Sequence, residues 1–149
     1  DLMKELQKEF NMAIILITHD LGVIAEAAQE VLVMYGGRIV EQSTVEALFS
    51  EPTHPYAWGL LGAVNSLELS GRGALATIPG SPPSLISLPA GCSFNPRCAH
   101  SSEICMTDVP ALRVVGSQGS VTVGSQGSVT ACHLPNDEII SLGRKAAAR

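Results

Sequence analysis

Four cysteines are the residues in this chain whose type and spacing most directly suggest chemistry. They are spaced Cys92-x5-Cys98-x6-Cys105-x26-Cys132. Cysteine thiolates bind zinc and iron–sulfur clusters. Structural zinc sites usually contain cysteine pairs two to four residues apart, and no such pair occurs here. The spacing therefore argues against zinc, while reduced thiols and an iron–sulfur site both remain open.

His19 is the second candidate, because it stands where an apolar run ends and a helix is expected to begin. The run is Met-Ala-Ile-Ile-Leu-Ile at residues 12–17, and Thr18-His19-Asp20 follow it. Ligands of open parallel sheets bind at the carboxyl ends of the strands. A neutral imidazole there could hydrogen-bond a phosphate oxygen or a water, although a structural or simply exposed histidine fits the position as well.

The elements that position His19 belong to a segment of alternating α/β character, residues 1–50. Its apolar run predicts a strand covered on both faces, as in a parallel sheet. Asp20 is placed to cap the following helix, and Gly36-Gly37 predicts a hairpin because glycine accepts positive φ. Ser43 and Glu46 have the spacing of a capping box. The expected elements are a helix at 1–10, strands at 12–17, 31–35 and 38–41, and helices after Asp20 and over 43–50.

The cysteines belong to a second segment, residues 51–140. A helix is expected to begin at His54-Pro55-Tyr56, with proline in its first turn and with Tyr56 and Trp58 used for packing. The proline-rich stretch 78–91 predicts an extended arm with many turns. Residues 115–122 are repeated without change at 123–130, which indicates a duplication in a surface loop. Residues 141–149 are expected to be a frayed terminus.

Composition excludes two classes of partner contact. The chain has 149 residues and a formal net charge of −5 with no dense Lys/Arg block, so binding to nucleic acid is not expected. Its longest apolar runs are far shorter than the roughly 20 residues that span a bilayer, so another subunit would have to anchor it at a membrane. The chain opens inside an amphipathic helix without a signal peptide, which indicates a fragment of a longer cytosolic protein. Cysteines there hold metal or stay reduced more often than they form disulfides.

Several segments resemble one known family. Residues 14–21, Ile-Ile-Leu-Ile-Thr-His-Asp-Leu, and residues 31–41 look like the end of an ABC-type nucleotide-binding domain, and the first ten residues match the segment after its Walker B strand and D-loop. Pro52-Thr53-His54-Pro55-Tyr56 matches the His-Pro-Tyr signature of oligopeptide/dipeptide importers. The proline, glycine and cysteine pattern from Ile78 onward resembles the tail of that subfamily. The match, over residues 1 to about 135, is to the C-terminal part of a bacterial importer's ATPase subunit.

The resemblance implies an α/β fold, the C-terminal portion of an ABC-type P-loop ATPase domain followed by a helical and extended cysteine-containing tail. His19 falls on the switch-loop histidine, which contacts the γ-phosphate of ATP and helps to position the attacking water. The intact protein would bind ATP with Mg²⁺. Cys92, Cys98, Cys105 and Cys132 fall in a tail that carries a [4Fe–4S] cluster in the subfamily, although the repeat lengthens the gap before Cys132. His100 and His133 could replace a thiolate, but we expect neither to bind metal.

The same resemblance implies partners and a location. They are transmembrane permease subunits, a second ATPase subunit and the upstream half of the nucleotide-binding domain, at the cytoplasmic face of a bacterial plasma membrane. The expected cargo is peptides or related solutes, because related importers also move nickel or other solutes.

This sequence contains no GxxxxGK[ST] phosphate loop, and the Q-loop, the signature motif and the Walker B acid with its catalytic glutamate are missing too. Phosphoryl transfer depends on positioning by those parts, so we expect no ATP hydrolysis by this chain alone. Two alternatives stay open: a stand-alone iron–sulfur or zinc-binding structural module, and an inert truncation product.

Overall fold

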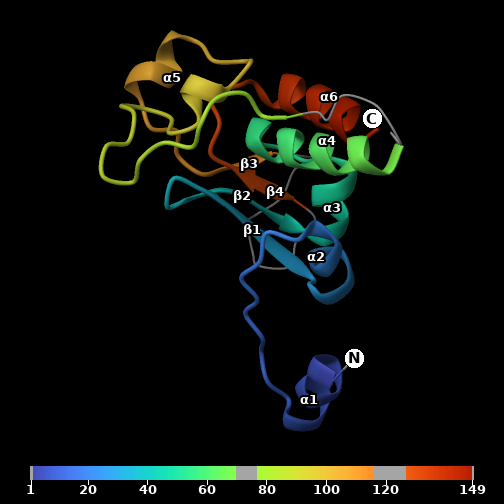
Figure 1. Cartoon of the computed structure of the whole chain (residues 1–149). Helices are drawn as coiled ribbons and strands as arrows, with labels where there is room; N and C mark the ends of the chain where they lie inside the picture. Colours follow the sequence, from blue (N-terminus) through green and yellow to red (C-terminus); the bar gives the residue numbers. More distant parts are fainter. Residues whose placement is uncertain (1, 70–76, 116–126, 149) are drawn as a thin grey trace.

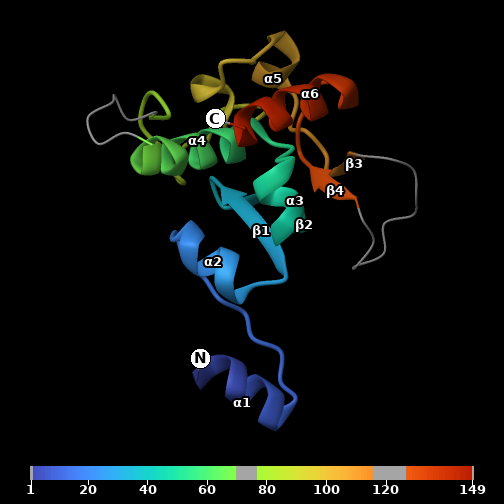
Figure 2. The same cartoon turned by 90° about the vertical axis from the view of Figure 1, so that its right-hand side faces the viewer.

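The computed structural model describes residues 2–69, 77–115 and 127–148. Within these ranges a four-stranded antiparallel sheet, with strand order β1-β2-β4-β3, forms the centre of the molecule. Three helices, α3, α4 and α6, pack together on the sheet (Figures 1 and 2). The described elements are α1 (Leu2–Phe10), α2 (Leu21–Ala27), β1 (Glu30–Tyr35), β2 (Arg38–Thr44), α3 (Val45–Ser50), α4 (Pro55–Leu69), a 3-10 turn η1 (Asn95–Arg97), α5 (Glu103–Thr107), β3 (Arg113–Val115), β4 (Ser128–Thr130) and α6 (Asn136–Ala147). The predicted α/β class is confirmed.

The hairpin between β1 and β2 confirms the expectation from Gly36-Gly37. Gly36 has φ 57° and Gly37 has φ 75°, the left-handed conformation that a two-residue hairpin turn requires. Val33 pairs with Glu41 and Met34 pairs with Ile39, so the register contains a bulge. The bulge breaks the usual alternation of buried and exposed residues, and two neighbouring residues of β2, Val40 and Glu41, are both buried.

The segment before α2 differs from the prediction. Residues 12–17 form no strand, and Ile15 and Ile17 are 92% and 94% exposed. Together with α1 they extend away from the rest of the chain (Figures 1 and 2). A parallel strand takes its hydrogen bonds from flanking strands, and none of the strands in the described part of the chain pairs with residues 12–17. The expectation of a buried parallel strand is therefore wrong for this structure, in which the sheet is antiparallel.

Of two helix N-caps predicted from the sequence, one is confirmed and one is shifted by a residue. Asp20 caps α2 as expected, and its Oδ1 accepts hydrogen bonds from the backbone N–H groups of Gly22 at 2.9 Å and Val23 at 3.2 Å. The capping box expected at Ser43 is wrong by one residue, because Thr44 is the N-cap and accepts from the N–H of Ala47. Ser43 lies instead in β2, where strand pairing holds it.

The second segment contributes both a helix and part of the same sheet. Pro55 begins α4 as expected, and residues 77–94 contain no helix or strand, which agrees with the predicted arm. The repeat lies largely outside the described residues, but its two ends belong to β3 and β4, which pair with each other. The terminus that we expected to fray from residue 141 continues as helix to Ala147, because Ile139 and Gly143 of α6 are buried. No helix among the described residues is long and apolar enough to cross a membrane.

Two apolar clusters hold these elements together. The larger joins the inner faces of β1 and β2 to α3, α4 and the cysteine-bearing segment, and it contains Val31, Val33, Tyr35, Val40, Leu48, Ala57 and Phe94. The smaller joins Trp58, Val115 and Ile139, from α4, β3 and α6. The cysteine-bearing segment is thus packed on the sheet through Phe94.

Candidate functional site

The four cysteines come from four separate places in the chain and are all half-buried, free thiols. Cys92 follows a glycine turn, Cys98 follows η1, Cys105 lies in α5, and Cys132 comes two residues after β4. The pairing of β4 with β2 and β3 therefore sets the position of Cys132.

One asparagine fixes the loop that carries the first three cysteines. The side-chain amide of Asn95 donates to the carbonyl oxygens of Cys92 at 2.9 Å and Cys105 at 3.1 Å. The N–H of Cys92 also donates to the carbonyl of Cys105 at 2.9 Å. Gly91 has φ 71°, and a Cβ there would lie 2.5 Å from the same carbonyl oxygen, so only glycine fits this approach. These contacts bring Cys92 and Cys105 together.

Electrostatics couple the thiols to one another. The pKa of the Cys98 thiol is raised to about 11, mainly by burial and also by charge on Cys132, Cys92 and Cys105, while a hydrogen bond with the His100 backbone opposes the rise. Burial also raises the pKa of Cys92 and of Cys132, with the charge of Cys105 adding to both. The raised pKa values of Cys92, Cys98 and Cys132 favour their protonated forms unless a cation compensates the thiolate charge.

Thiols of this kind have the right donor chemistry for an iron–sulfur cluster or zinc, but they do not form a preassembled site. Within residues 2–69, 77–115 and 127–148, no group of three or more His, Cys, Asp or Glu side chains is arranged to hold a metal ion. His133 hydrogen-bonds the carbonyl of Asp108 through Nε2 at 2.9 Å, and His100 packs edge-on against Trp58 at 5.5 Å between ring centroids.

His19 lies elsewhere. It is exposed in the bend immediately before α2, and α2 lies beside β1, well separated from α5 in both views (Figures 1 and 2). The structure therefore does not bring His19 to the cysteines.

The His-Pro-Tyr motif organises a buried polar site that the sequence analysis missed. Glu41 is fully buried, and its carboxylate accepts hydrogen bonds from two consecutive backbone N–H groups, those of Thr53 at 3.0 Å and His54 at 2.8 Å. Burial raises the pKa of Glu41 to about 7, and the two backbone hydrogen bonds oppose that shift. The carboxylate thus joins β2 to the start of α4.

His54 is the second polar group of this site, with 1% of its surface exposed. Its Nδ1 accepts from the N–H of Tyr56 at 3.1 Å, which caps the first turn of α4. Burial lowers the pKa of His54 to about 4, while a hydrogen bond with the Ala131 backbone opposes the change. His54 is therefore a neutral structural residue.

Aromatic contacts connect the motif to the cysteine loop. The Phe94 ring lies 5.1 Å from Tyr35, 5.5 Å from Tyr56 and 5.8 Å from His54, between ring centroids. Arg97 adds polar contacts, since it donates to the carbonyl oxygens of Pro79 and Ile78 and to the hydroxyl of Tyr35. The motif thereby positions the segment between Cys92 and Cys98.

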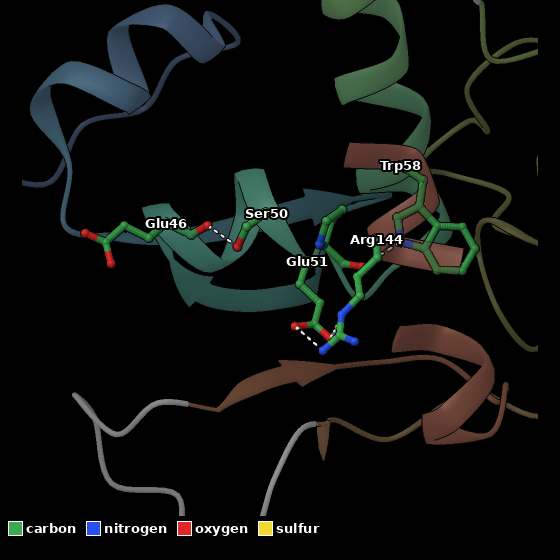
Figure 3. Close-up of polar contacts among 6 residues, drawn as sticks. Glu46, Ser50, Glu51, Trp58 and Arg144 are labelled. Carbon is green, nitrogen blue, oxygen red and sulfur yellow. Dashed lines mark hydrogen bonds and ion pairs between the residues drawn. The ribbon is translucent and has the colours of Figure 1, made fainter. Parts of the chain in front are cut away.

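Trp58 has the packing role that we expected for it. It is buried, and its Nε1–H donates to the carbonyl of Pro52 at 2.7 Å. Figure 3 shows Trp58 near Arg144 of α6, whose Nε lies 3.2 Å from Oε1 of Glu51. This ion pair is largely exposed and contributes at most about 1 kcal/mol. The packing of Trp58 against Ile139 of α6 therefore stabilises this helix more than the ion pair between Arg144 and Glu51 does.

Comparison with known proteins identifies the class. Residues 40–105 match the family described as Oligopeptide/dipeptide transporter, C-terminal region. These residues include the Glu41 site, the His-Pro-Tyr motif and three of the cysteines. Residues 40–105 thus match the C-terminal region of this family, and the resemblance drawn from the sequence is confirmed.

Individual relatives are ATP-binding proteins. The oligopeptide transport ATP-binding protein OppD of Salmonella typhimurium is 53% identical over 109 residues, which cover 73% of this chain and 32% of that protein. OppD of Bacillus subtilis is 47% identical over 112 residues, covering 75% of this chain and 31% of that protein. A putative peptide import ATP-binding protein of Brucella ovis is 49% identical over 120 residues, covering 77% and 36%. The chain spans about a third of the length of these relatives.

Proposed function

We propose that this chain is the C-terminal part of an ATPase subunit that drives import of peptides or related solutes through an ABC transporter. The observation that carries the proposal is the identity of about half of the aligned residues to proteins named for oligopeptide transport and ATP binding. In the intact protein, ATP with Mg²⁺ would be the energy source. The partners would be permease subunits, a second ATPase subunit and the upstream half of the same nucleotide-binding domain, at the cytoplasmic face of a bacterial plasma membrane. Residues 1–50 would complete that domain, and residues 51–140 would form its subfamily-specific tail.

His19 would be the γ-phosphate contact. Its position after an apolar segment and immediately before the capped start of α2 supports this role, because side chains at such junctions are open to a ligand. The exposed imidazole is also free to meet a nucleotide held by other parts of the protein.

A chimera tests this proposal. The segment of the Salmonella relative that aligns with this chain is replaced by the chain, and ATP turnover, nucleotide binding and peptide uptake are measured. We expect uptake and turnover to be retained, and His19→Ala to lower turnover on the order of 10²-fold with binding preserved, since the contact acts as charge develops at the phosphate. The chain alone should release no phosphate from Mg-ATP. Equal losses of binding and turnover in His19→Ala would contradict the catalytic role.

We further propose that Cys92, Cys98, Cys105 and Cys132 together hold one [4Fe–4S] cluster. The mutual electrostatic coupling of the thiols and the Asn95 brace between Cys92 and Cys105 support it. A bound cluster would supply the positive charge that lets the thiols ionise. Its assembly would have to draw the four side chains closer together.

Anaerobic purification with iron, sulfide and zinc analysis tests the cluster. We expect iron matched by sulfide and an absorption band near ~400 nm. Each Cys→Ser change should lower the iron content, with Ser87→Ala, at an exposed position of the preceding arm, as a control. Stoichiometric zinc without the band, or no metal, would refute the proposal.

A further inference from the structure

A pocket of about 580 Å³ lies between α4, α6 and the segments at Thr77–Pro79 and Phe94–His100. None of the four cysteines lines it. Its volume falls within the roughly 300–1,000 Å³ of typical small-molecule sites. Its walls are mostly apolar and include Trp58 and Gly62 of α4 and Leu142 of α6. The space suits an apolar body of limited size.

The charged side chains that line this pocket are both cations. They are Arg97 and Lys145, and no Asp or Glu of the described residues lines it, although the chain as a whole carries a net charge of −5. Clefts lined by charge of one sign attract ligands of the opposite sign. The pocket therefore favours an anion against the overall charge of the chain.

Arg97 is a fixed positive charge in the wall. Its Nε donates to the carbonyl of Pro79 at 2.8 Å and its Nη2 donates to the carbonyl of Ile78 at 3.0 Å. Both acceptors are neutral, and Arg97 forms no ion pair with any residue in the described part of the chain. Its charge is thus held in place without being neutralised. Lys145 is exposed on α6 and can reach a ligand at the mouth of the pocket.

We propose that this pocket binds a small amphipathic monocarboxylate, with its apolar body against Trp58 and Leu142 and its carboxylate at Lys145. The N–H donors of Arg97 already bind Pro79, Ile78 and Tyr35, so Lys145 would donate the hydrogen bond to the carboxylate. Arg97 would attract the carboxylate through its positive charge alone. This arrangement suits one negative charge better than a phosphate, whose several oxygens need more free donors. The proposal is independent of the import function.

Trp58 provides the readout, because it is the single tryptophan of the chain and lines the pocket. Decanoate is titrated into the 149-residue protein while Trp58 emission is recorded, with decanol as the neutral probe of similar apolar body. We expect a saturable change with decanoate and at least about 3-fold weaker binding of decanol, the scale of one exposed ion pair. Absence of a saturable change, or equal affinity for the two probes, would overturn the proposal.

Two variants assign the binding to this pocket. A Cβ at Gly62 would meet no atom within 4 Å, so the larger side chain of Gly62→Leu should fill the space and abolish saturable decanoate binding. Gly62→Ala is the matched control and should retain it; both changes favour the helix, so both variants should fold. Decanoate binding that survives in folded Gly62→Leu would place the ligand elsewhere and refute the proposal.

Lys145→Gln tests the charge and does not depend on the Gly62 variants. It should weaken decanoate binding by about 3- to 5-fold and leave decanol unchanged. Lys4→Gln on α1, which does not line the pocket, should change neither. An equal loss in both lysine variants would show a general charge effect and refute a specific contact.

Discussion

Glu41 and His54 should give the protein two opposite dependences of stability on pH. Burial raises the pKa of Glu41 from 4.5 to about 7, so the folded state holds this proton more tightly than the unfolded chain. The contribution of Glu41 is therefore full below pH 4.5 and decreases as the pH rises to about 7. Burial lowers the pKa of His54 from 6.5 to about 4, so its contribution is full above pH 6.5 and decreases as the pH falls toward 4.

The two effects are similar in size. Each pKa is displaced by about 2.5, which corresponds to about 3 kcal/mol of unfolding free energy at roughly 1.4 kcal/mol per pH unit. Because the slopes have opposite signs and overlap between pH 4.5 and 6.5, they should largely cancel in the unsubstituted protein. Single substitutions should reveal one slope at a time.

Glu41→Gln removes the pH dependence that comes from Glu41 and leaves that of His54. The unfolding free energy should then fall by up to about 3 kcal/mol as the pH is lowered from 6.5 toward 4. His54→Asn retains an acceptor for the N–H of Tyr56, and its stability should instead rise as the pH is lowered from about 7 to 4.5. Urea midpoints followed by circular dichroism across this range measure both. The slope is the readout, because the substitutions also change the absolute stability.

One result would refute this reasoning directly. If Glu41→Gln and the unsubstituted chain show parallel pH profiles, Glu41 titrates in the folded state as it does in the unfolded chain. The N–H groups of Thr53 and His54 would then stabilise the charged carboxylate as strongly as burial destabilises it.

One deletion and two substitutions test the packing. Deleting residues 116–123 removes one copy of the repeat and keeps both β3 and β4. The unfolding free energy measured in urea should rise by no more than about 1 kcal/mol, because a shorter loop loses less entropy when it closes. A large loss of stability would mean that the deleted copy packs against the domain. Gly143→Ala should lower stability by about 1–3 kcal/mol, because a Cβ there would clash with the carbonyl oxygen of Pro52, and an unchanged thermal midpoint would contradict the close approach. Trp58→Phe should cost about 1–3 kcal/mol of unfolding free energy in the same assay, because it leaves that buried carbonyl without its donor at 2.7 Å; a neutral result would mean that water replaces the indole N–H.

Features set by neighbouring residues could be predicted from the sequence. The Gly36-Gly37 hairpin and the Asp20 cap each depend on a few consecutive residues, and both are confirmed. The family resemblance could also be predicted, because it rests on a short contiguous motif at residues 52–56. Local reasoning failed at Ser43, where pairing of β2 with β1 extended the strand past the expected helix start.

Features set by distant residues could not be predicted in this way. A glutamate in a strand ordinarily faces water, and only the bulge opposite Val33 and the turn before α4 make Glu41 a buried acceptor. The signal available was a glutamate directly after two apolar residues and shortly before a proline-bounded motif. The prediction of a strand at residues 12–17 also failed because of distant partners. A buried parallel strand needs neighbouring strands to pair with, and no strand among the described residues pairs with this segment. The role of His19 and the assembly of the four thiols stay predictions.

The pairing of β2 with β4 has a consequence for the order of folding. The hydroxyl of Thr130 donates to the carbonyl of Val40, 90 positions earlier, and to that of Thr53, 77 positions earlier. Contacts of such sequence separation form late, because a long stretch of chain must be ordered before they contribute. During synthesis on the ribosome the β1–β2 hairpin can therefore form early, but the buried site around Glu41 stays open until β4 has left the exit tunnel. Translation that stops before residue 128 would release a chain with β2 as an unpaired edge, a state that invites association with other strands and removal by quality control.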